Sequence, residues 1–161
     1  MKRITSFLAL SAIVVAGAFA GTAAQASAAN VNVNFKVHNA DGLSQSMIRS
    51  GAPSSGISGL INPAAAILPG GDDPATGFAL FSLPVPNVNS SVQGTVSYAN
   101  ASDGISNLCT FTITVQRNGL SSYLLAFSVV NNSSHCSVPS GIVNSSTGQF
   151  TSTTYELDWS T

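Results

Sequence analysis

The chain has 161 residues and a formal net charge of −1, with 44% hydrophobic but only 7% charged residues. Beyond residue 28, three Lys or Arg side chains stand against six acidic ones. This composition excludes the basic stripe that nucleic-acid binding requires and disfavours attraction to anionic lipid head groups.

Residues 1–28 are predicted to be a signal peptide. Lys2 and Arg3 give the start a positive charge, residues 4–20 are almost entirely apolar, and Ala-x-Ala patterns follow. The apolar run is shorter than the roughly 20 residues of a membrane-spanning helix, so we expect cleavage. Residues 29–161 would then form one exported domain without a transmembrane segment, located in the periplasm, on the cell surface or outside the cell.

The first strand is predicted at residues 31–37, where Val31, Val33, Phe35 and Val37 alternate with polar residues. A turn is expected at residues 38–42. Residues 43–76 are rich in Gly, Ser, Ala and Pro, and because long structureless loops are uncommon, short strands are expected near 56–61 and 66–68.

A turn is also expected at residues 70–74. Its carboxylates, Asp72 and Asp73, could contribute to a calcium site, but the evenly spaced ligands of a dedicated calcium loop are absent. A solvated loop tip is therefore the favoured interpretation. Two further strands are predicted, a buried one at 77–83 and an alternating one at 92–99, whose residues Val92, Gly94, Val96 and Tyr98 share a face.

The clearest pattern is a hairpin across residues 108–130. On its first strand one face carries Cys109, Phe111, Ile113 and Val115, and the other carries Thr110, Thr112, Thr114 and Gln116. This alternation is typical of a strand with one buried side and one wet side.

Two loops could close the hairpin. A two-residue Asn118-Gly119 turn would place Phe111 opposite Ala126, and would put Tyr123, Leu125 and Phe127 on the threonine face. A three-residue loop with Gly119 at positive φ reverses these faces and pairs Phe111 with Leu125 and Ile113 with Tyr123. We expect the three-residue loop, because it buries the large side chains.

A short strand near 141–143 and a final strand at 149–159 follow, the latter with Tyr155, Leu157 and Trp159 on one face. The pattern of strands and turns without a helical period predicts an all-β fold. We expect a single-domain antiparallel β-sandwich of Greek-key or jelly-roll type.

Cys109 and Cys136 are the only cysteines, and in an exported protein we expect them to form a disulfide. A metal site with the adjacent His135 is the alternative. It would have two thiols and one imidazole but no fourth ligand, so no metal is expected.

Catalytic motifs are scarce. His38 and His135 both fall in predicted loops, and the chain has no Gly-x-Ser-x-Gly motif, phosphate loop or dinucleotide fingerprint. Glu156 and Asp158 are the one acidic pair suited to glycoside hydrolysis, but their alternation with Tyr155 and Trp159 places them on the solvent face of the last strand. We therefore expect neither enzymatic activity nor a cofactor.

The row of Thr110, Thr112 and Thr114 is the candidate binding face, since such rows can contact glycans or regular surfaces. Threonine is also a good strand former. The expected function is that of an exported, adhesin-like or envelope-associated binding module, with a surface ligand, glycan or protein as partner.

Two alternatives stay open. One is a subunit that assembles by strand exchange, and the other is a small secreted hydrolase. Fimbrial subunits share the low charge, the single disulfide and the early alternating strand, although their bridge usually lies near the N-terminus, whereas Cys109 and Cys136 come late.

Overall fold

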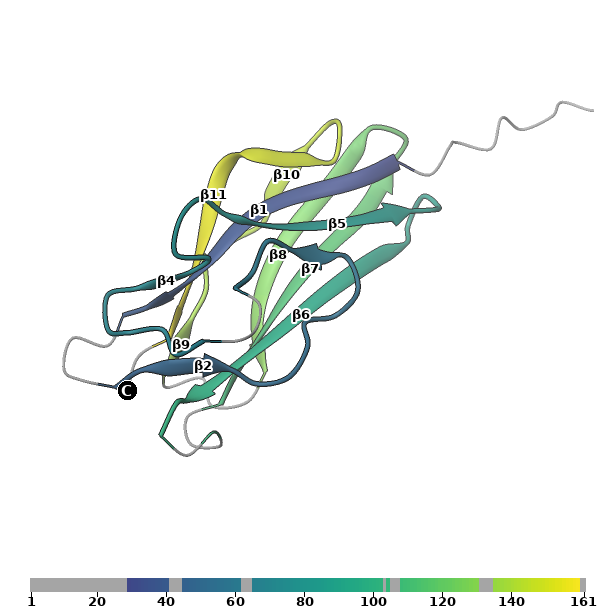
Figure 1. Cartoon of the computed structure of the whole chain (residues 1–161). Helices are drawn as coiled ribbons and strands as arrows, with labels where there is room; N and C mark the ends of the chain where they lie inside the picture. Colours follow the sequence, from purple (N-terminus) through teal and green to yellow (C-terminus); the bar gives the residue numbers. More distant parts are fainter. Residues whose placement is uncertain are drawn as a thin grey trace, which may run out of the picture.

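The computed structural model describes residues 29–40, 45–61, 65–102, 104, 108–130 and 135–159. The predicted signal peptide lies outside these ranges. The described residues form strands and no helix (Figure 1), and so no helix among them could cross a membrane. The strands, in chain order, are β1 (Ala29–Asn39), β2 (Met47–Arg49), β3 (Ile57–Ser58), β4 (Asp72–Asp73), β5 (Ala79–Val85), β6 (Ser91–Asn100), β7 (Cys109–Gly119), β8 (Ser122–Val130), β9 (Cys136–Ser137), β10 (Val143–Ser145) and β11 (Gln149–Trp159).

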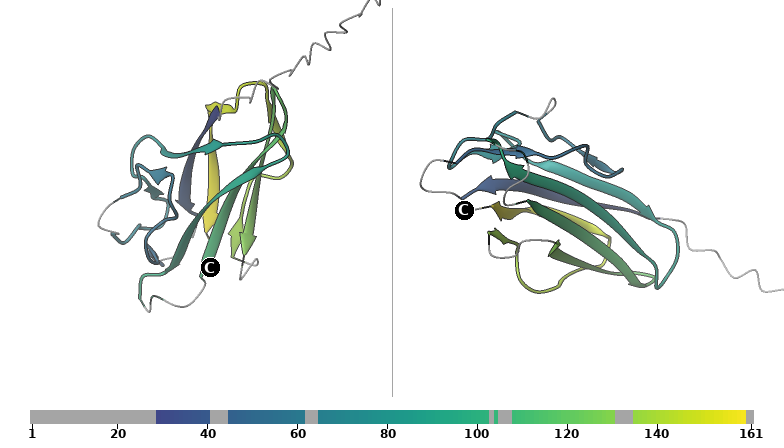
Figure 2. Two further views of the ribbon diagram at one scale, coloured as in Figure 1. Left: turned by 90° about the vertical axis from the view of Figure 1, so that its right-hand side faces the viewer. Right: turned by 90° about the horizontal axis from the view of Figure 1, so that it is seen from below.

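The strands form two sheets that lie in two layers (Figure 2). Sheet I has the order β3-β5-β1-β11-β9, with β4 paired to the end of β1, and sheet II has the order β10-β8-β7-β6-β2. The all-β prediction is confirmed, but the expectation of purely antiparallel pairing is wrong. The first strand, β1, runs parallel to the last strand, β11. A parallel pair needs a long connection, and here almost the whole described chain separates the two strands.

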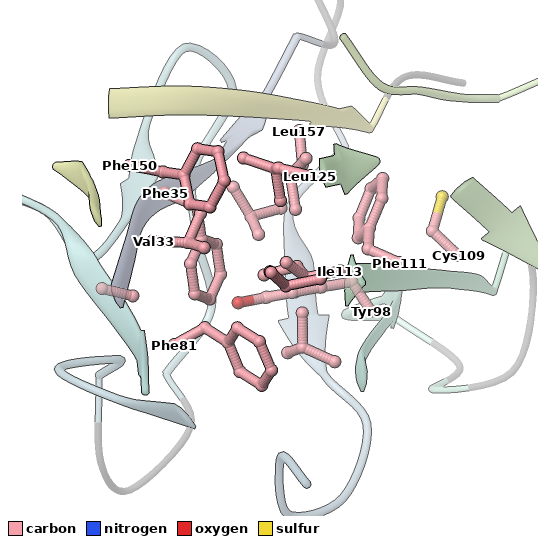
Figure 3. Close-up of a cluster of buried hydrophobic side chains, with 14 of the residues drawn as sticks. Val33, Phe35, Phe81, Tyr98, Cys109, Phe111, Ile113, Leu125, Phe150 and Leu157 are labelled. Carbon is pink, nitrogen blue, oxygen red and sulfur yellow. The ribbon is translucent and has the colours of Figure 1, made fainter. Parts of the chain in front are cut away.

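The two sheets share one hydrophobic core (Figure 3). The inward side chains of β1 are fully buried, as the alternation predicted; they are Val31, Val33, Phe35 and Val37. They meet side chains of sheet II that include Tyr98, Phe111, Ile113 and Leu125. Gly94 on β6 makes room for Phe81 from β5, because a Cβ at position 94 would lie 2.6 Å from the Phe81 ring.

Among the described strands, the chain changes from one sheet to the other six times. Between β2 in sheet II and β3 in sheet I, the chain follows β6, where the amides of Ser50 and Ser54 bond to the carbonyls of Ser97 and Thr95. Between β9 in sheet I and β10 in sheet II, the chain crosses in the opposite direction.

The predicted disulfide is present and joins the two sheets. Cys109 lies on β7 and Cys136 on β9, with 5.9 Å between their Cα atoms. The bridge therefore links the layers covalently as well as closing a loop along the chain.

The central hairpin has the predicted faces but not the predicted register. Phe111 lies opposite Val129 instead of Leu125, and Ile113 lies opposite Phe127 instead of Tyr123. The strands continue past Asn118 through a bulge and turn between Gly119 and Ser122, and Gly119 is not at positive φ. Both proposed loops were therefore wrong. Because the register moved by four residues, an even number, Tyr123 and Leu125 still face the core.

Arg117 explains the longer hairpin. Its guanidinium donates hydrogen bonds to the carbonyls of Gly119 and Leu120, each at 3.2 Å, and lies 5.6 Å from the centre of the Tyr123 ring. The side chain is only 3% exposed. These contacts stabilise a turn that lies after the Asn118-Gly119 dipeptide, although the turn propensity of Asn-Gly favours a turn at the dipeptide itself.

The short strands β2 and β9 were not predicted from the sequence. The other strands lie close to the predicted ranges, with three differences. His38 and Asn39 continue β1 instead of starting a turn, while residues 41–44 lie outside the described ranges. Of residues 66–68, only Ile67 pairs, through one bridge to Met47. The predicted turn at 70–74 contains β4, which pairs with β1 at Val37 and His38.

Candidate functional site

The predicted threonine row belongs to a larger polar surface on the outer side of sheet II. Residues directly opposite one another on β6, β7 and β8 form three rows of three, which we call the hydroxyl face. The rows are Ser97-Thr110-Val130, Thr95-Thr112-Ser128 and Gln93-Thr114-Ala126. None of the nine residues is charged or aromatic.

Hydrogen bonds order the two outer rows of this face. Ser97 and Thr110 share a hydroxyl–hydroxyl bond of 2.9 Å, and the Gln93 amide donates to the Thr114 hydroxyl at 3.2 Å. The middle row differs, because within the described residues the Thr112 hydroxyl has no hydrogen-bond partner. The face therefore has constrained edges and an unpartnered centre.

The expectation that all three threonines are solvent-exposed is wrong. Thr112 is only 8% exposed, and Thr110 and Thr114 are half-buried. β7 is the central strand of sheet II, so Thr112 is enclosed by Thr95 on one side, Ser128 on the other and its neighbours above and below. A short side chain in the middle of a sheet loses most of its exposure in this way.

The outer side of sheet I carries a second polar group. Ser137, Asp158, His38 and Asp72 lie side by side on β9, β11, β1 and β4, and we call them the charged row. Nδ1 of His38 lies 2.7 Å from Oδ1 of Asp72, and the Ser137 hydroxyl donates to Oδ2 of Asp158 at 3.3 Å.

Lys36 lies beside the charged row and connects two carboxylates. Its Nζ is 2.6 Å from Glu156 and 3.3 Å from Asp72. This contact raises the pKa of Lys36 and lowers the pKa of Glu156. Burial, assisted by the charge of Glu156, raises the pKa of Asp158. The acidic pair singled out in the sequence thus lies on one outer face, with Glu156 exposed and Asp158 half-buried.

The charged row brings Ser, His and Asp together, but in an order that does not suit nucleophilic catalysis. An activated serine needs a hydrogen bond to the imidazole that takes its proton. Here β11 separates β9 from β1, and the Ser137 hydroxyl bonds to the Asp158 carboxylate instead.

A buried polar cluster was not anticipated from the sequence. The Asp73 carboxylate accepts a 2.6 Å bond from the Tyr98 hydroxyl and a 2.7 Å bond from the amide of Ile61, and it lies 3.5 Å from Nη1 of Arg49. Asp73 is 1% exposed, so the prediction of a solvated loop tip is wrong for this residue. Burial next to a carboxylate raises the pKa of Tyr98 far above its usual value.

The sequence holds one signal of this cluster. Tyr98 follows Val92, Gly94 and Val96 on the inward face of β6, and a tyrosine on a buried face usually bonds its hydroxyl to a polar partner. The identity of the partner depends on the β4–β1 pairing, which the local pattern does not reveal.

The candidate metal ligands are not gathered into a site. Cys136 is bonded to Cys109, and the described residues contain no group of three or more His, Cys, Asp or Glu side chains placed to hold a metal ion. Asp72 pairs with Lys36 and His38, while Asp73 points into the core.

Comparisons with known proteins give no relative: no protein-family model, no curated protein and no solved structure matches this chain.

Proposed function

We propose that this protein is an exported, non-enzymatic binding or surface-associated module that contacts its partner through the hydroxyl face. The main observation in support is that the nine residues of this face are uncharged and that most of them bear a hydroxyl group. At their centre lies Thr112, whose hydroxyl has no hydrogen-bond partner within the described residues. The charged side chains of the described residues lie elsewhere, in the core, in the charged row with its neighbours Lys36 and Glu156, and beneath the hairpin turn.

The proposal includes export and a fold type. Residues 1–28 have the composition of a signal peptide, and an interlayer disulfide suits an oxidising compartment. We assign the two layers to a β-sandwich of Greek-key or jelly-roll type, formed by residues 29–161 as one domain.

Placing a charge on the hydroxyl face tests this function. Ser128→Lys and Thr114→Lys introduce a bulky cation there, and Thr153→Lys adds the same charge at an exposed position of β11 on sheet I. Tagged protein is incubated with bacterial cells, immobilised glycans and liposomes, and the retained fraction is measured. We expect retention on at least one of these supports, lost in the first two variants and kept in Thr153→Lys. Equal retention of all variants, or none by the wild type, would contradict the proposal.

Strand exchange is a second candidate, favoured by the position of β1. This strand is the first in the described chain, yet it lies between β5 and β11, and its four inward side chains are fully buried. Withdrawing it would open a groove that the β1 of a second copy fits. Exchanging an identical element in this way is a low-cost route to assembly.

A disulfide trap separates exchange from a self-contained monomer. Asn32 and Gln149 are opposite each other on β1 and β11, with their side-chain amides 2.8 Å apart. In an Asn32→Cys/Gln149→Cys variant, strand exchange gives covalent multimers on a non-reducing gel. A monomeric band with both new thiols oxidised would rule strand exchange out.

A further inference from the structure

From the hydroxyl face we infer a ligand class: the protein binds insoluble neutral polysaccharide, through Thr95, Thr112 and the hydroxyls around them. This inference rests on the proposed function, because it names the ligand of the proposed contact surface. Three properties of the face carry it, namely its chemistry, its unpartnered centre and its extent.

The chemistry of the face selects a neutral, hydroxyl-rich partner. A serine or threonine hydroxyl is both donor and acceptor, as are the hydroxyls of a sugar. None of the nine residues is a cation that could pair with sulfate, phosphate or carboxylate groups, and none is an acid. An anionic polymer would find no counter-charge on this surface.

The centre of the face holds a polar group without a partner. Thr112 is 8% exposed and its hydroxyl makes no hydrogen bond within the described residues, although its neighbours in the outer rows are bonded in pairs. The Thr112 oxygen is not among the fully buried unpartnered polar atoms of the described residues, so it can be reached from solvent. A sugar hydroxyl approaching between Thr95 and Ser128 would supply the missing partner.

The extent of the face favours a polymer over a free sugar. Hydroxyls repeat at roughly 6.6 Å along each strand and at roughly 4.8 Å between strands. Without an aromatic side chain for a sugar ring to stack on, each contact is a single modest hydrogen bond. Binding then depends on many contacts made together, which an extended, ordered polymer surface offers and a monosaccharide does not.

Retention on particulate cellulose, chitin and β-1,3-glucan tests the inference. The test variant is Thr95→Val/Thr112→Val/Thr114→Val, which removes three hydroxyls while keeping side-chain shape. The control is Thr151→Val/Thr153→Val/Thr154→Val, which removes three exposed hydroxyls from β11 on the other sheet. Thermal melting and the intact disulfide verify that both variants fold.

We expect the wild type and the control to be retained on at least one neutral polymer. Retention of the test variant should be at least about tenfold weaker, because each lost hydrogen bond costs roughly two- to tenfold. Salt at about 1 M should change little, since no ion pair contributes.

Three results would overturn the inference. Equal retention of the test variant and the control places any polysaccharide site away from the hydroxyl face. A second result is that the wild type binds to no neutral polymer while cells still bind it and do not bind Ser128→Lys. In that case the inferred ligand class is wrong, but the hydroxyl face is still supported as the contact surface. Loss of both kinds of binding would remove the proposed function as well.

Discussion

The hydroxyl of Tyr98 donates a 2.6 Å hydrogen bond to Oδ2 of Asp73 in the protein interior, and both side chains are almost completely buried. Tyr98→Phe keeps the ring but removes this donor from a buried carboxylate. We expect a loss of about 1–3 kcal/mol in the free energy of unfolding, measured by urea denaturation. Asp73→Ala should cost more, about 3–5 kcal/mol, because it leaves Arg49 buried without its counter-charge.

Tyr155→Phe is the matched control for the Tyr98 variant. Tyr155 is half-buried and its hydroxyl makes no hydrogen bond within the described residues, so this variant should change stability by less than about 0.5 kcal/mol. Equal effects of the two tyrosine variants would mean that the Tyr98–Asp73 bond contributes nothing measurable.

The disulfide between Cys109 and Cys136 should stabilise the protein strongly. Its partners are 27 positions apart, and closing a loop of this length in the unfolded chain is worth roughly 3–4 kcal/mol in the chain-entropy model. Reduction should lower the melting temperature and raise the intact mass by two hydrogens. Two thiols that are freely alkylated in the native, non-reduced protein would contradict the pairing.

Asp158 should lower stability at neutral pH. Burial raises its pKa above 3.8, so the unfolded chain releases this proton more readily, and the penalty on the folded state is complete above the folded pKa. Asp158→Asn should therefore have a higher melting temperature than the wild type at pH 7. The difference should vanish below pH 3.8, where the wild-type carboxyl is protonated in both states. A lower melting temperature of Asp158→Asn at pH 7 would reverse the sign of this effect.

Glycines at two positions should differ sharply in their tolerance of a methyl group. In Gly94→Ala the new Cβ would lie 2.6 Å from the Phe81 ring, and overpacking of this kind costs about 1–3 kcal/mol. In Gly119→Ala the nearest atom is 3.6 Å away and φ is not positive, so the cost should stay below about 1 kcal/mol. Denaturant midpoints of the two variants give the comparison, and a larger effect at Gly119 would support the tighter loop that the structure rejects.

Hydrolysis is expected to be absent. A panel of glycosidase and esterase substrates should show no turnover, because the Ser, His and Asp side chains of the charged row are arranged with Asp158 between Ser137 and His38. Turnover by the wild type that disappears in both Glu156→Gln and Asp158→Asn would instead identify a hydrolase using that acidic pair.

Faces could be predicted from the sequence where registers could not. Alternation placed Phe111 on the buried side, since the side-chain period of a strand is a local property, and the gain from burying large side chains placed Tyr123 and Leu125 on the same side. The pairing of Phe111 with Val129 was missed because Arg117, folded over Tyr123, decides where the hairpin turns. This contact joins side chains on opposite sides of the turn, so the alternation of apolar and polar residues along each strand does not predict it.

The candidate site was also predictable only in part: the sequence indicates the residues of one strand but not their neighbours on the adjoining strands. The threonine row is visible in the sequence of β7, but the hydroxyl face forms only because β6 and β8 place Thr95 and Ser128 beside Thr112. Asp73 was assigned to solvent because Asp72-Asp73 resembles a turn, and only its pairing with β1 turns its carboxylate toward Tyr98. Long-range pairing accounts for both differences.

The parallel pairing of β1 and β11 also determines how this protein would respond to mechanical force. The two strands lie side by side (Figure 1), and in their parallel register Ala29 begins β1 at one end of the pair while Trp159 ends β11 at the other. A pull that separates these two residues acts along the strands, so it must shear the β1–β11 hydrogen bonds together instead of unzipping them one at a time. A protein held at one end while drag acts at the other would be loaded in its most resistant direction.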